Sequence, residues 1–263
     1  MMNRRIAVSV KDLNWQYGKE KLFKGLNLEI HQNRFYGIVG PNGSGKTTLL
    51  KNISRNLDPG AQKIFLIDKD IAAMKQKEIS QYIALVPQNT QIEFEFPVMD
   101  IVLMGRTPYI KRFETESEAD LRIAEDAMRQ TNIWHLRNKG INEISGGELQ
   151  RAIIARGLAQ QAEVLLLDEP VSQLDLHYQV SIMELVRDLV HNQGKTAVAV
   201  MHDLNLTSAY CDEIVLMDRG KIAATGSPDT VLTYQNIERV YDVKVLVIED
   251  PVTGRPHVIP FST

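Results

Sequence analysis

Residues 40–48 have the residue types and the spacing needed to hold a phosphate group, because they match the pattern G-x-x-x-x-G-K-[ST]. Glycines let the backbone curl until several N–H groups point inward, and the helix that follows adds the positive end of its dipole. Lys46 would reach the β- and γ-phosphates of a nucleotide, and the Thr47 hydroxyl would ligate Mg²⁺. The stretch consists of Gly40, Pro41, Asn42, Gly43, Ser44, Gly45, Lys46, Thr47 and Thr48.

Two carboxylates follow an apolar run further along the chain. Residues 164–167 read Val-Leu-Leu-Leu, which is typical of a strand buried on both faces, and Asp168 and Glu169 come directly after them. The carboxyl end of such a strand is where open α/β sheets bind ligands. Asp168 would hold Mg²⁺ through water, and Glu169 would act as the general base on the attacking water. A solvated acidic loop is the alternative, which the phosphate-binding pattern upstream disfavours.

A third pattern, Ser145-Gly146-Gly147-Glu148, precedes residues at helical spacing. Two glycines just inside a helix start are costly unless the backbone must approach something closely. Free N–H groups, the serine hydroxyl and the helix dipole would together form a second anion site. Two anion sites in one chain suggest shared use of a single nucleotide, and the alternative is a serine-capped helix with a flexible start.

In their order along the chain, these motifs resemble those of the nucleotide-binding subunits of ABC transporters. Residues 40–48 look like Walker A, residues 164–169 like Walker B with its catalytic glutamate, and residues 144–148 like the LSGGQ signature. Gln88 matches the Q-loop glutamine, and Asp175 matches the D-loop aspartate. His202 matches the switch histidine, and Tyr17 matches the aromatic residue that stacks on adenine. Order and spacing carry the resemblance, since a lone Gln, Tyr or His is structural far more often than functional.

The resemblance implies a set of roles for these residues. Lys46, Glu169 and His202 would be catalytic. Thr47, Gln88 and Asp168 would hold Mg²⁺. ATP would be bound by residues of all the remaining motifs, which are Tyr17, Gly40, Pro41, Asn42, Gly43, Ser44, Gly45, Lys46, Thr47, Thr48, Ser145, Gly146, Gly147, Glu148 and Asp175.

The resemblance also implies partners. Two copies would pair head to tail, with each ATP between residues 40–48 of one copy and residues 145–148 of the other. The dimer would be a peripheral ATPase on the cytoplasmic face of the membrane, joined to two polytopic permease subunits and served indirectly by a substrate-binding protein. The alternative is a soluble ABC ATPase of DNA repair or translation, which usually has two cassettes in one chain or a long coiled coil. A P-loop kinase or small GTPase would not explain residues 145–148.

The sequence departs from the family pattern at two places, and two other stretches indicate a narrower group within the family. The signature ends in Glu148 where Gln is usual, and residues 171–173 read Val-Ser-Gln where Thr-Ser-Ala is usual. Asp175, which carries the inter-subunit contact in the family, is kept, so activity is expected to survive both changes. Residues 100–109 and 250–257 are similar to stretches of ATPases that serve iron–siderophore, haem and cobalamin importers. Molybdate or tungstate importers of the same architecture are the alternative.

Composition limits the remaining possibilities. The 263 residues, 44% of them hydrophobic, suffice for one large domain or for a core with an inserted subdomain. A net charge of −3 does not indicate a broad basic face, so no nucleic acid partner is expected. The single cysteine, Cys211, excludes an internal disulfide and fits a reducing compartment. No apolar stretch approaches the length of a membrane span, so any membrane role would come through a partner.

The elements that must position these residues follow from the hydrophobic pattern. Strands are expected at 6–15, 22–30, 35–39, 63–68, 83–86, 164–167, 196–201, 214–217 and 221–225, and helices from 117, from 145, over 174–191 and over 203–210. Alternation of strands and helices argues for a mostly parallel sheet covered by helices. Together with the resemblance, it predicts an α/β fold: a P-loop NTPase (RecA-like) core with an N-terminal antiparallel β subdomain and an inserted helical subdomain.

The predicted domain organisation is a single ABC ATPase domain. Its core would comprise about residues 1–89 and 162–263, and its helical subdomain about residues 90–161. Aromatic and apolar residues gather in and beside irregular segments at the start of that subdomain, at Phe94, Phe96, Tyr109, Ile110 and Phe113. If several are exposed they would form a docking patch for a membrane partner. The alternative is that they pack beneath the helical subdomain.

Overall fold

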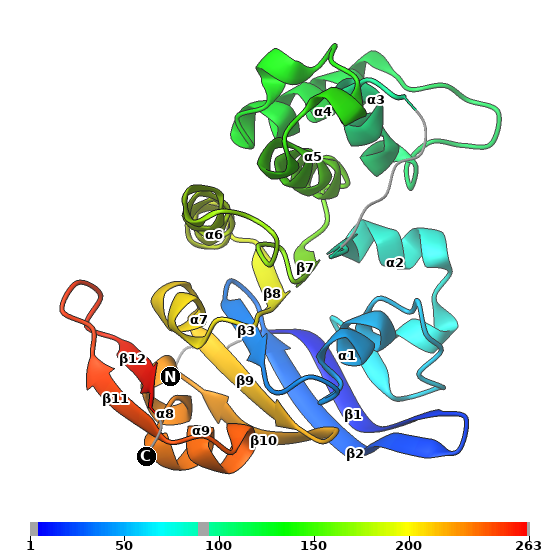
Figure 1. The fold of residues 1–263 in the computed structure, drawn as a ribbon. Coiled ribbons are helices and arrows are strands. Elements are labelled where there is room, and N and C mark those ends of the chain that lie inside the picture. The colour runs from blue at the N-terminus through cyan, green and yellow to red at the C-terminus, as the bar shows by residue number, and fades with distance from the viewer. Residues whose placement is uncertain (1–4, 89–94, 262–263) are drawn as a thin grey trace. The chain divides into compact units, whose positions relative to one another are not determined.

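The structure is a computed structural model, which describes residues 5–88 and 95–261 (Figure 1). The chain divides into two compact units, which are described separately below. The first unit comprises residues up to Met74 together with the residues from Val186 onward, and the second unit is Lys75–Leu185. The division into a core and a helical subdomain at residues 90 and 161 stays a prediction.

The first unit begins with an antiparallel sheet. β1 (Ile6–Tyr17) pairs with β2 (Glu20–His31) on one side and with β4 (Ile64–Leu66) on the other, and the short β5 (Lys69–Asp70) completes the order β2-β1-β4-β5. Alternating side chains of β2 are buried, as expected for a sheet with one face on the core. The N-terminal antiparallel β subdomain that the sequence predicts is therefore confirmed.

The second sheet of the first unit is centred on β3 (Phe35–Val39), whose five residues are all buried. β3 pairs in parallel with β8 (Thr196–Val200) and with β9 (Glu213–Asp218), and β10 (Lys221–Gly226) closes the edge antiparallel to β9. Strands buried on both faces read as continuous apolar runs, which β3, β8 and β9 do. The carboxyl ends of β3 and β8 lie at the same edge, and the residues that follow both strands are site candidates.

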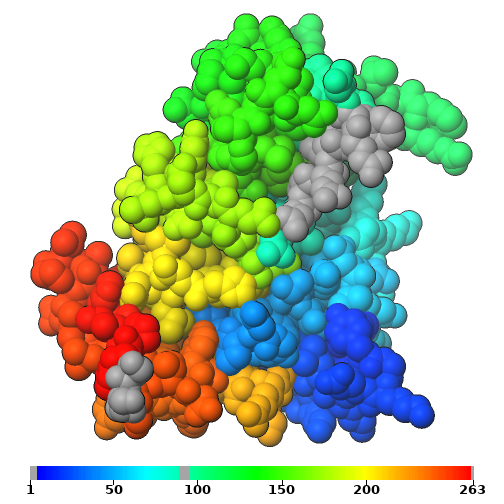
Figure 2. All heavy atoms as spheres, in the orientation of Figure 1, coloured from blue at the N-terminus to red at the C-terminus, as the bar shows by residue number. Residues whose placement is uncertain are grey.

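Helices of the first unit follow these strands. α1 (Lys46–Ile53) comes after β3, α7 (Leu204–Tyr210) after β8, and α8 (Pro228–Val231) and α9 (Tyr234–Tyr241) after β10. A one-turn 3₁₀ helix, Ile71–Ala73, comes after β5. The C-terminal hairpin of β11 (Val245–Glu249) and β12 (Pro256–Pro260) packs on α7 and α9, as the red and orange segments show (Figures 1 and 2). The helices expected from the sequence include α7 but not α9, although Ile237 and Val240 of α9 are buried on one side of the helix.

The second unit combines two parallel strands with helices. β6 (Ile83–Val86) pairs with β7 (Val164–Asp168), whose five residues are all buried. The helices are α2 (Gln76–Tyr82), α3 (Val98–Leu103), α4 (Glu118–Gln130), α5 (Gly146–Ala159) and α6 (Leu176–His191), and α6 runs past the boundary at Leu185. One-turn 3₁₀ helices lie at Met104–Arg106, Trp134–Leu136 and Ile141–Glu143. The expected α/β fold class is confirmed, although α2 lacks a periodic apolar stripe and is not anticipated.

None of the helices among the described residues is both long and apolar enough to cross a bilayer.

A buried charge holds the helices of the second unit together. Arg106 donates from Nε to Asp120 Oδ1 at 2.8 Å and from Nη1 to Ala159 O at 2.8 Å, so it links α4 to the end of α5. Gly105 makes this approach possible, because a Cβ there would lie 2.2 Å from Arg156 O. Hydrogen bonds from the Ser117 hydroxyl and from Arg106 lower the pKa of Asp120 to about 2. The carboxylate therefore stays ionised opposite the guanidinium.

We predict that Asp120→Asn lowers the free energy of unfolding by about 2 kcal/mol at pH 7, the equivalent of the Asp120 pKa shift. Because the folded-state pKa is depressed, this stability is present above the unfolded pKa of 3.8 and is lost as the pH falls toward 2. Urea unfolding of both proteins at pH 7, 5 and 3.5 would show the difference shrinking. Asp126→Asn is the matched control, an exposed aspartate of the same helix. A pH-independent difference would contradict the prediction.

Candidate functional site

The loop between β3 and α1 is built around glycines with positive φ. Gly40 has a φ of 151° and Gly45 a φ of 103°, values that side-chain-bearing residues rarely adopt. Both positions are also crowded: a Cβ at Gly40 would lie 2.2 Å from Met217 O, and one at Gly45 would lie 2.6 Å from the Phe23 ring. These two glycines are therefore required by conformation and by packing, and they fix the path of residues 40–48.

The loop leads into a helix start that no side chain caps. The N-cap residue Gly45 makes no side-chain cap hydrogen bond, and the first turn of α1 holds no acidic residue, so no anionic side chain of that turn meets the positive end of the helix dipole. The Ser44 hydroxyl is buried and has no hydrogen-bond partner. Buried polar groups are normally paired, so an orphaned hydroxyl beside a helix N-terminus marks a place for an anion. The residues present fit a bound phosphate.

Lys46 is held at the base of this loop. Its side chain is buried, and Nζ donates to Gly40 O at 2.8 Å and to Pro41 O at 3.1 Å. These two bonds hold the ammonium at the base of the loop, where it would face a phosphate bound to residues 40–48.

Two residues that the sequence patterns do not single out support the loop. Gly220, in the turn between β9 and β10, donates its N–H to Ser44 O at 3.0 Å, and a Cβ there would lie 1.7 Å from Leu22 O. The Tyr241 hydroxyl of α9 hydrogen-bonds the backbone of Gly40, and burial raises the pKa of that hydroxyl to about 12. Only the packing of distant segments shows these roles; the turn sequence Asp-Arg-Gly at 218–220 predicts a hairpin and nothing more.

Tyr17 and His202 complete the candidate site of the first unit. The Tyr17 hydroxyl lies 3.3 Å from Thr48 Oγ1, and its ring is half exposed and stands edge-on to Trp15. An exposed ring at the end of the phosphate loop can stack on a base. His202 is exposed and follows β8, whose carboxyl end lies beside that of β3. The structure thus places the aromatic residue, the loop and the histidine in one unit.

The second unit presents the two carboxylates at the end of β7. Asp168 is the last, buried residue of the strand. Glu169 follows with a φ of 50°, a left-handed conformation that is uncommon for a non-glycine residue and that concentrates at functional sites. Gln88 Nε2 donates to Glu169 Oε2 at 2.5 Å. The predicted metal set of Thr47, Gln88 and Asp168 offers hydroxyl, amide and carboxylate oxygens, and oxygen ligands are what Mg²⁺ prefers.

The start of α5 is closed by a reciprocal cap. Ser145 N–H and Ser145 Oγ both donate to Glu148 Oε2 at 2.8 Å, and Glu148 N–H donates back to Ser145 Oγ at 3.4 Å. The backbone and hydroxyl of Ser145 hold the pKa of Glu148 below its usual value. The carboxylate that replaces the usual glutamine therefore serves as a helix cap, and the N–H groups of Gly146 and Gly147 lie in the first turn of the same helix.

The segment after Glu169 lies beside this helix. Asp175 Oδ1 accepts a hydrogen bond from Tyr178 N–H at 3.1 Å, which caps the first turn of α6. A cavity of about 420 Å³ is lined by residues of four motifs, namely Gln88, Gly146, Leu149, Gln150, Ile153, Glu169, Pro170, Ser172, Gln173 and Leu174. The second unit therefore brings the predicted base, the Q-loop glutamine and the signature helix around one cavity.

Comparisons with known proteins agree with this geometry. The profile of the ABC transporter family matches residues 23–172. The ferric enterobactin transport ATP-binding protein of Escherichia coli is 37% identical over 252 residues, which cover 96% of this chain and 93% of that protein. The cobalamin import ATP-binding protein of Halobacterium salinarum is 37% identical over 255 residues, which cover 97% of this chain but only 64% of that longer protein.

A solved structure also matches over nearly the whole chain. It is a chain of a metal-chelate type ABC transporter in an inward-facing conformation, with a TM-score of 0.86, 28% sequence identity and 98% coverage of both chains. Together with the relatives, it confirms the resemblance that the motif order indicates.

The two signature glycines differ in what surrounds them, and this leads to a prediction. A Cβ at Gly147 would lie 2.3 Å from the Tyr178 ring, whereas one at Gly146 would meet only Leu174 at 3.9 Å. We expect Gly147→Ala to lower the free energy of unfolding by about 1–3 kcal/mol through overpacking. Gly146→Ala, the matched control, should leave it unchanged or slightly raised, because alanine favours helices. Urea unfolding measures both, and adding Tyr178→Ala should rescue Gly147→Ala. Equal effects of the two alanines would contradict this account.

Proposed function

This chain belongs to the ABC transporter family, and we propose that it is the ATP-hydrolysing subunit of a binding-protein-dependent importer. The observation that carries the proposal is the loop of residues 40–48: the buried Ser44 hydroxyl has no hydrogen-bond partner, no side chain caps α1, and the Lys46 ammonium is held at the base of the loop. The relatives named above, both described as ATP-binding proteins, support ATP as the ligand that supplies its phosphates.

The residues of the chain divide the work of hydrolysis. The loop N–H groups and the Ser44 hydroxyl bind phosphate oxygens, and the Lys46 ammonium moves from loop carbonyls to the β- and γ-phosphates. Glu169 accepts the proton of the attacking water, and His202 holds the γ-phosphate. The bond from Gln88 orients the Glu169 carboxylate. Mg²⁺, held by Thr47, Asp168 and Gln88, would neutralise charge on the phosphates.

The proposed partners follow from the incompleteness of each site. The N–H groups at the start of α5 form a second anion site, so a second copy of the chain would supply them to the nucleotide in a head-to-tail dimer. The dimer would drive two polytopic permease subunits from the cytoplasmic face of the membrane, and closure followed by product release would transmit the motion.

The cargo of the importer is proposed from similarity to other proteins, because the ATPase subunit itself does not contact the cargo. The names of the relatives point to an iron–siderophore or cobalamin importer, and residues 100–109 and 250–257 resemble that group, which also includes haem importers. A molybdate or tungstate importer is the alternative. Growth of a deletion strain on each cargo as limiting nutrient would distinguish them.

Glu169→Gln tests the proposed mechanism most directly. The substitution keeps the shape of the side chain and removes the base, so we expect the turnover number for ATP to fall by about 10²–10⁴-fold. ATP binding should survive because the groups of residues 40–48 are untouched. Lys46→Ala is the matched comparison: it should lose turnover and weaken nucleotide binding together, since it removes the only full positive charge of the loop. Steady-state hydrolysis and equilibrium nucleotide binding would be measured side by side.

For each variant, one result would contradict the role proposed for the residue. Wild-type turnover in Glu169→Gln would refute the general-base role, and near-normal turnover in Lys46→Ala would refute the assignment of the loop. If hydrolysis separates the two copies, Glu169→Gln should also form a long-lived dimer with ATP and Mg²⁺ on size-exclusion chromatography. Failure to dimerise with the membrane partners present would refute the shared site.

The proposed surface for the permease lies after α3. Phe113 is 94% exposed and Tyr109 37% exposed, while Ile110 and Phe96 are partly buried and Phe94 lies outside the described residues. Tyr109 is fixed by its hydroxyl, which donates to Gln160 O at 3.0 Å, and by the Arg106 guanidinium stacked 4.0 Å from its ring centroid. Phe113 is exposed four residues after Tyr109, whose side chain is held by these two contacts. This arrangement favours a docking patch over core packing.

We predict that Phe113→Asp reduces transport and co-purification with the permease at least about tenfold, because a charge would be buried in an apolar contact. Hydrolysis by the isolated chain and its unfolding temperature should not change. Val252→Asp is the matched control, since Val252 is also apolar and is 90% exposed in the first unit. Equal losses in both variants, or none in Phe113→Asp, would rule out the patch.

A further inference from the structure

α7 is too short to hold its own position. It has seven residues, and isolated helices of fewer than about 12 residues are marginal in water. His202 lies between the end of β8 at Val200 and the start of α7 at Leu204, so the direction of its side chain depends on how both elements are anchored. The anchoring of α7 is therefore part of the geometry of the site.

The chain on either side of His202 is fixed by hydrogen bonds. Before it, Met201 N–H donates to Ile38 O of β3 at 2.9 Å. After it, Asp203 Oδ1 accepts the N–H groups of Asn205 and Leu206, both at 2.8 Å, and caps α7. Any rotation or shift of α7 would consequently move the peptide that carries His202.

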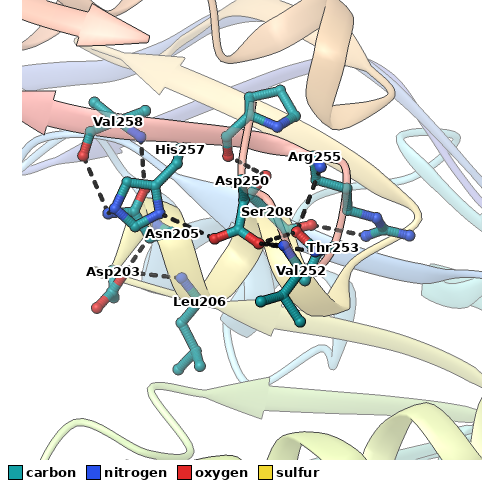
Figure 3. Close-up of polar contacts among 11 residues, drawn as sticks. Asp203, Asn205, Leu206, Ser208, Asp250, Val252, Thr253, Arg255, His257 and Val258 are labelled. Carbon is teal, nitrogen blue, oxygen red and sulfur yellow. Dashed lines mark hydrogen bonds and ion pairs between the residues drawn. The ribbon is translucent and has the colours of Figure 1, made fainter. Parts of the chain in front are cut away.

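The outer side of α7 is held by the C-terminal hairpin. The Asn205 amide pairs with the backbone of β12 in the manner of a neighbouring strand: Nδ2 donates to Val258 O at 3.1 Å, and Oδ1 accepts Val258 N–H at 2.7 Å (Figure 3). Ser208 Oγ donates to Pro256 O at 2.7 Å. These bonds join a helix directly after the site to residues about 50 positions later in the chain.

The C-terminal end of α7 is held by the same hairpin. Arg255 donates from Nη1 to Ser208 O at 2.7 Å (Figure 3). The same Nη1 donates to Cys211 O at 2.7 Å, so Arg255 satisfies carbonyls that a helix end leaves unpaired. Arg255 is presented by a tight turn in which Asp250 Oδ1 accepts the N–H groups of Val252 and Thr253. The orange and red atoms of the hairpin meet the yellow atoms of this part of the chain at the surface (Figure 2).

The inner side of α7 leaves it no room to move. A Cβ at Gly37 of β3 would lie 2.3 Å from Thr207 Cγ2 and 2.9 Å from Cys211 Sγ, so helix and strand are in direct contact. β3 leads into the phosphate loop. α7 is thus wedged between the strand that carries the loop and the hairpin that ends the chain.

We propose that the hairpin β11–β12 positions His202 for ATP hydrolysis by clamping α7 through Asn205, Ser208 and Arg255. The inference rests on the proposed function, because it takes His202 as the group that holds the γ-phosphate. The three clamp residues are positioning residues: they touch α7 or the hairpin and no substrate. The hairpin is therefore a working part of the ATPase.

The test is Asn205→Ala in the full chain, which removes both bonds to Val258 and leaves His202 in place. The kcat for ATP hydrolysis should fall by about fivefold or more, while KM and nucleotide affinity change by less than about twofold, because the phosphate-binding groups are intact. Arg255→Lys should retain more activity than Arg255→Ala, since lysine still donates to carbonyls. Val252→Ala is the control in the same hairpin, with a side chain that is 90% exposed, and should match the wild type.

A double-mutant cycle with His202→Ala separates positioning from general loosening. If the clamp acts through His202, Asn205→Ala costs nothing further in the His202→Ala chain. Equal losses of kcat in both backgrounds, or an unchanged kcat in Asn205→Ala, overturn the inference while leaving the proposed function intact. Wild-type turnover in His202→Ala would instead overturn the role of His202 and the clamp with it. If Asn205→Ala does not fold, Ser208→Ala, which loses one hydrogen bond, is taken through the same cycle.

Discussion

The structure depends on one constraint: Gly40 and Gly45 must keep the positive-φ backbone conformations that curl residues 40–48 in front of α1. A chain can hold such a conformation only if its surroundings over-determine it. Gly40 is pressed against Met217 O, Gly220 donates to Ser44 O, and the Tyr241 hydroxyl reaches the Gly40 backbone. The parallel strands, the β9–β10 turn and α9 can all be understood as the support of this one loop.

In the second unit, the important feature is which partner each carboxylate has. Glu169 has a left-handed backbone conformation and accepts a hydrogen bond from Gln88. The Glu148 carboxylate instead caps α5. The Arg106–Asp120 pair is buried among the helices, and the segment that exposes Phe113 lies between these two residues in the chain. Each of these carboxylates therefore has a structural partner, and the candidate groups for the chemistry lie at the end of β7 and the start of α5.

Local rules explain what could be predicted. The spacing of glycine, lysine and threonine in residues 40–48 is dictated by phosphate geometry, and the apolar run at 164–167 is dictated by burial on both faces of β7, so both are legible without a structure. Ser117 at the start of α4 and Asp203 at the start of α7 cap helices where a hydrophobic repeat begins. Fold class, most strands and the order of the motifs follow from such patterns.

The sequence by itself determined which residues are the candidates for the chemistry, because their types and spacing reflect the proposed ligand and the local backbone geometry. Only the tertiary structure decided what holds them. Nothing in the pattern shows that Tyr241 supports the loop, that Gly147 is glycine because the Tyr178 ring lies against it, or that Asn205 and Arg255 tie α7 to the hairpin. These contacts join segments far apart along the chain, so they depend on how whole elements pack, and the local sequence pattern does not tell which residues of two distant elements meet.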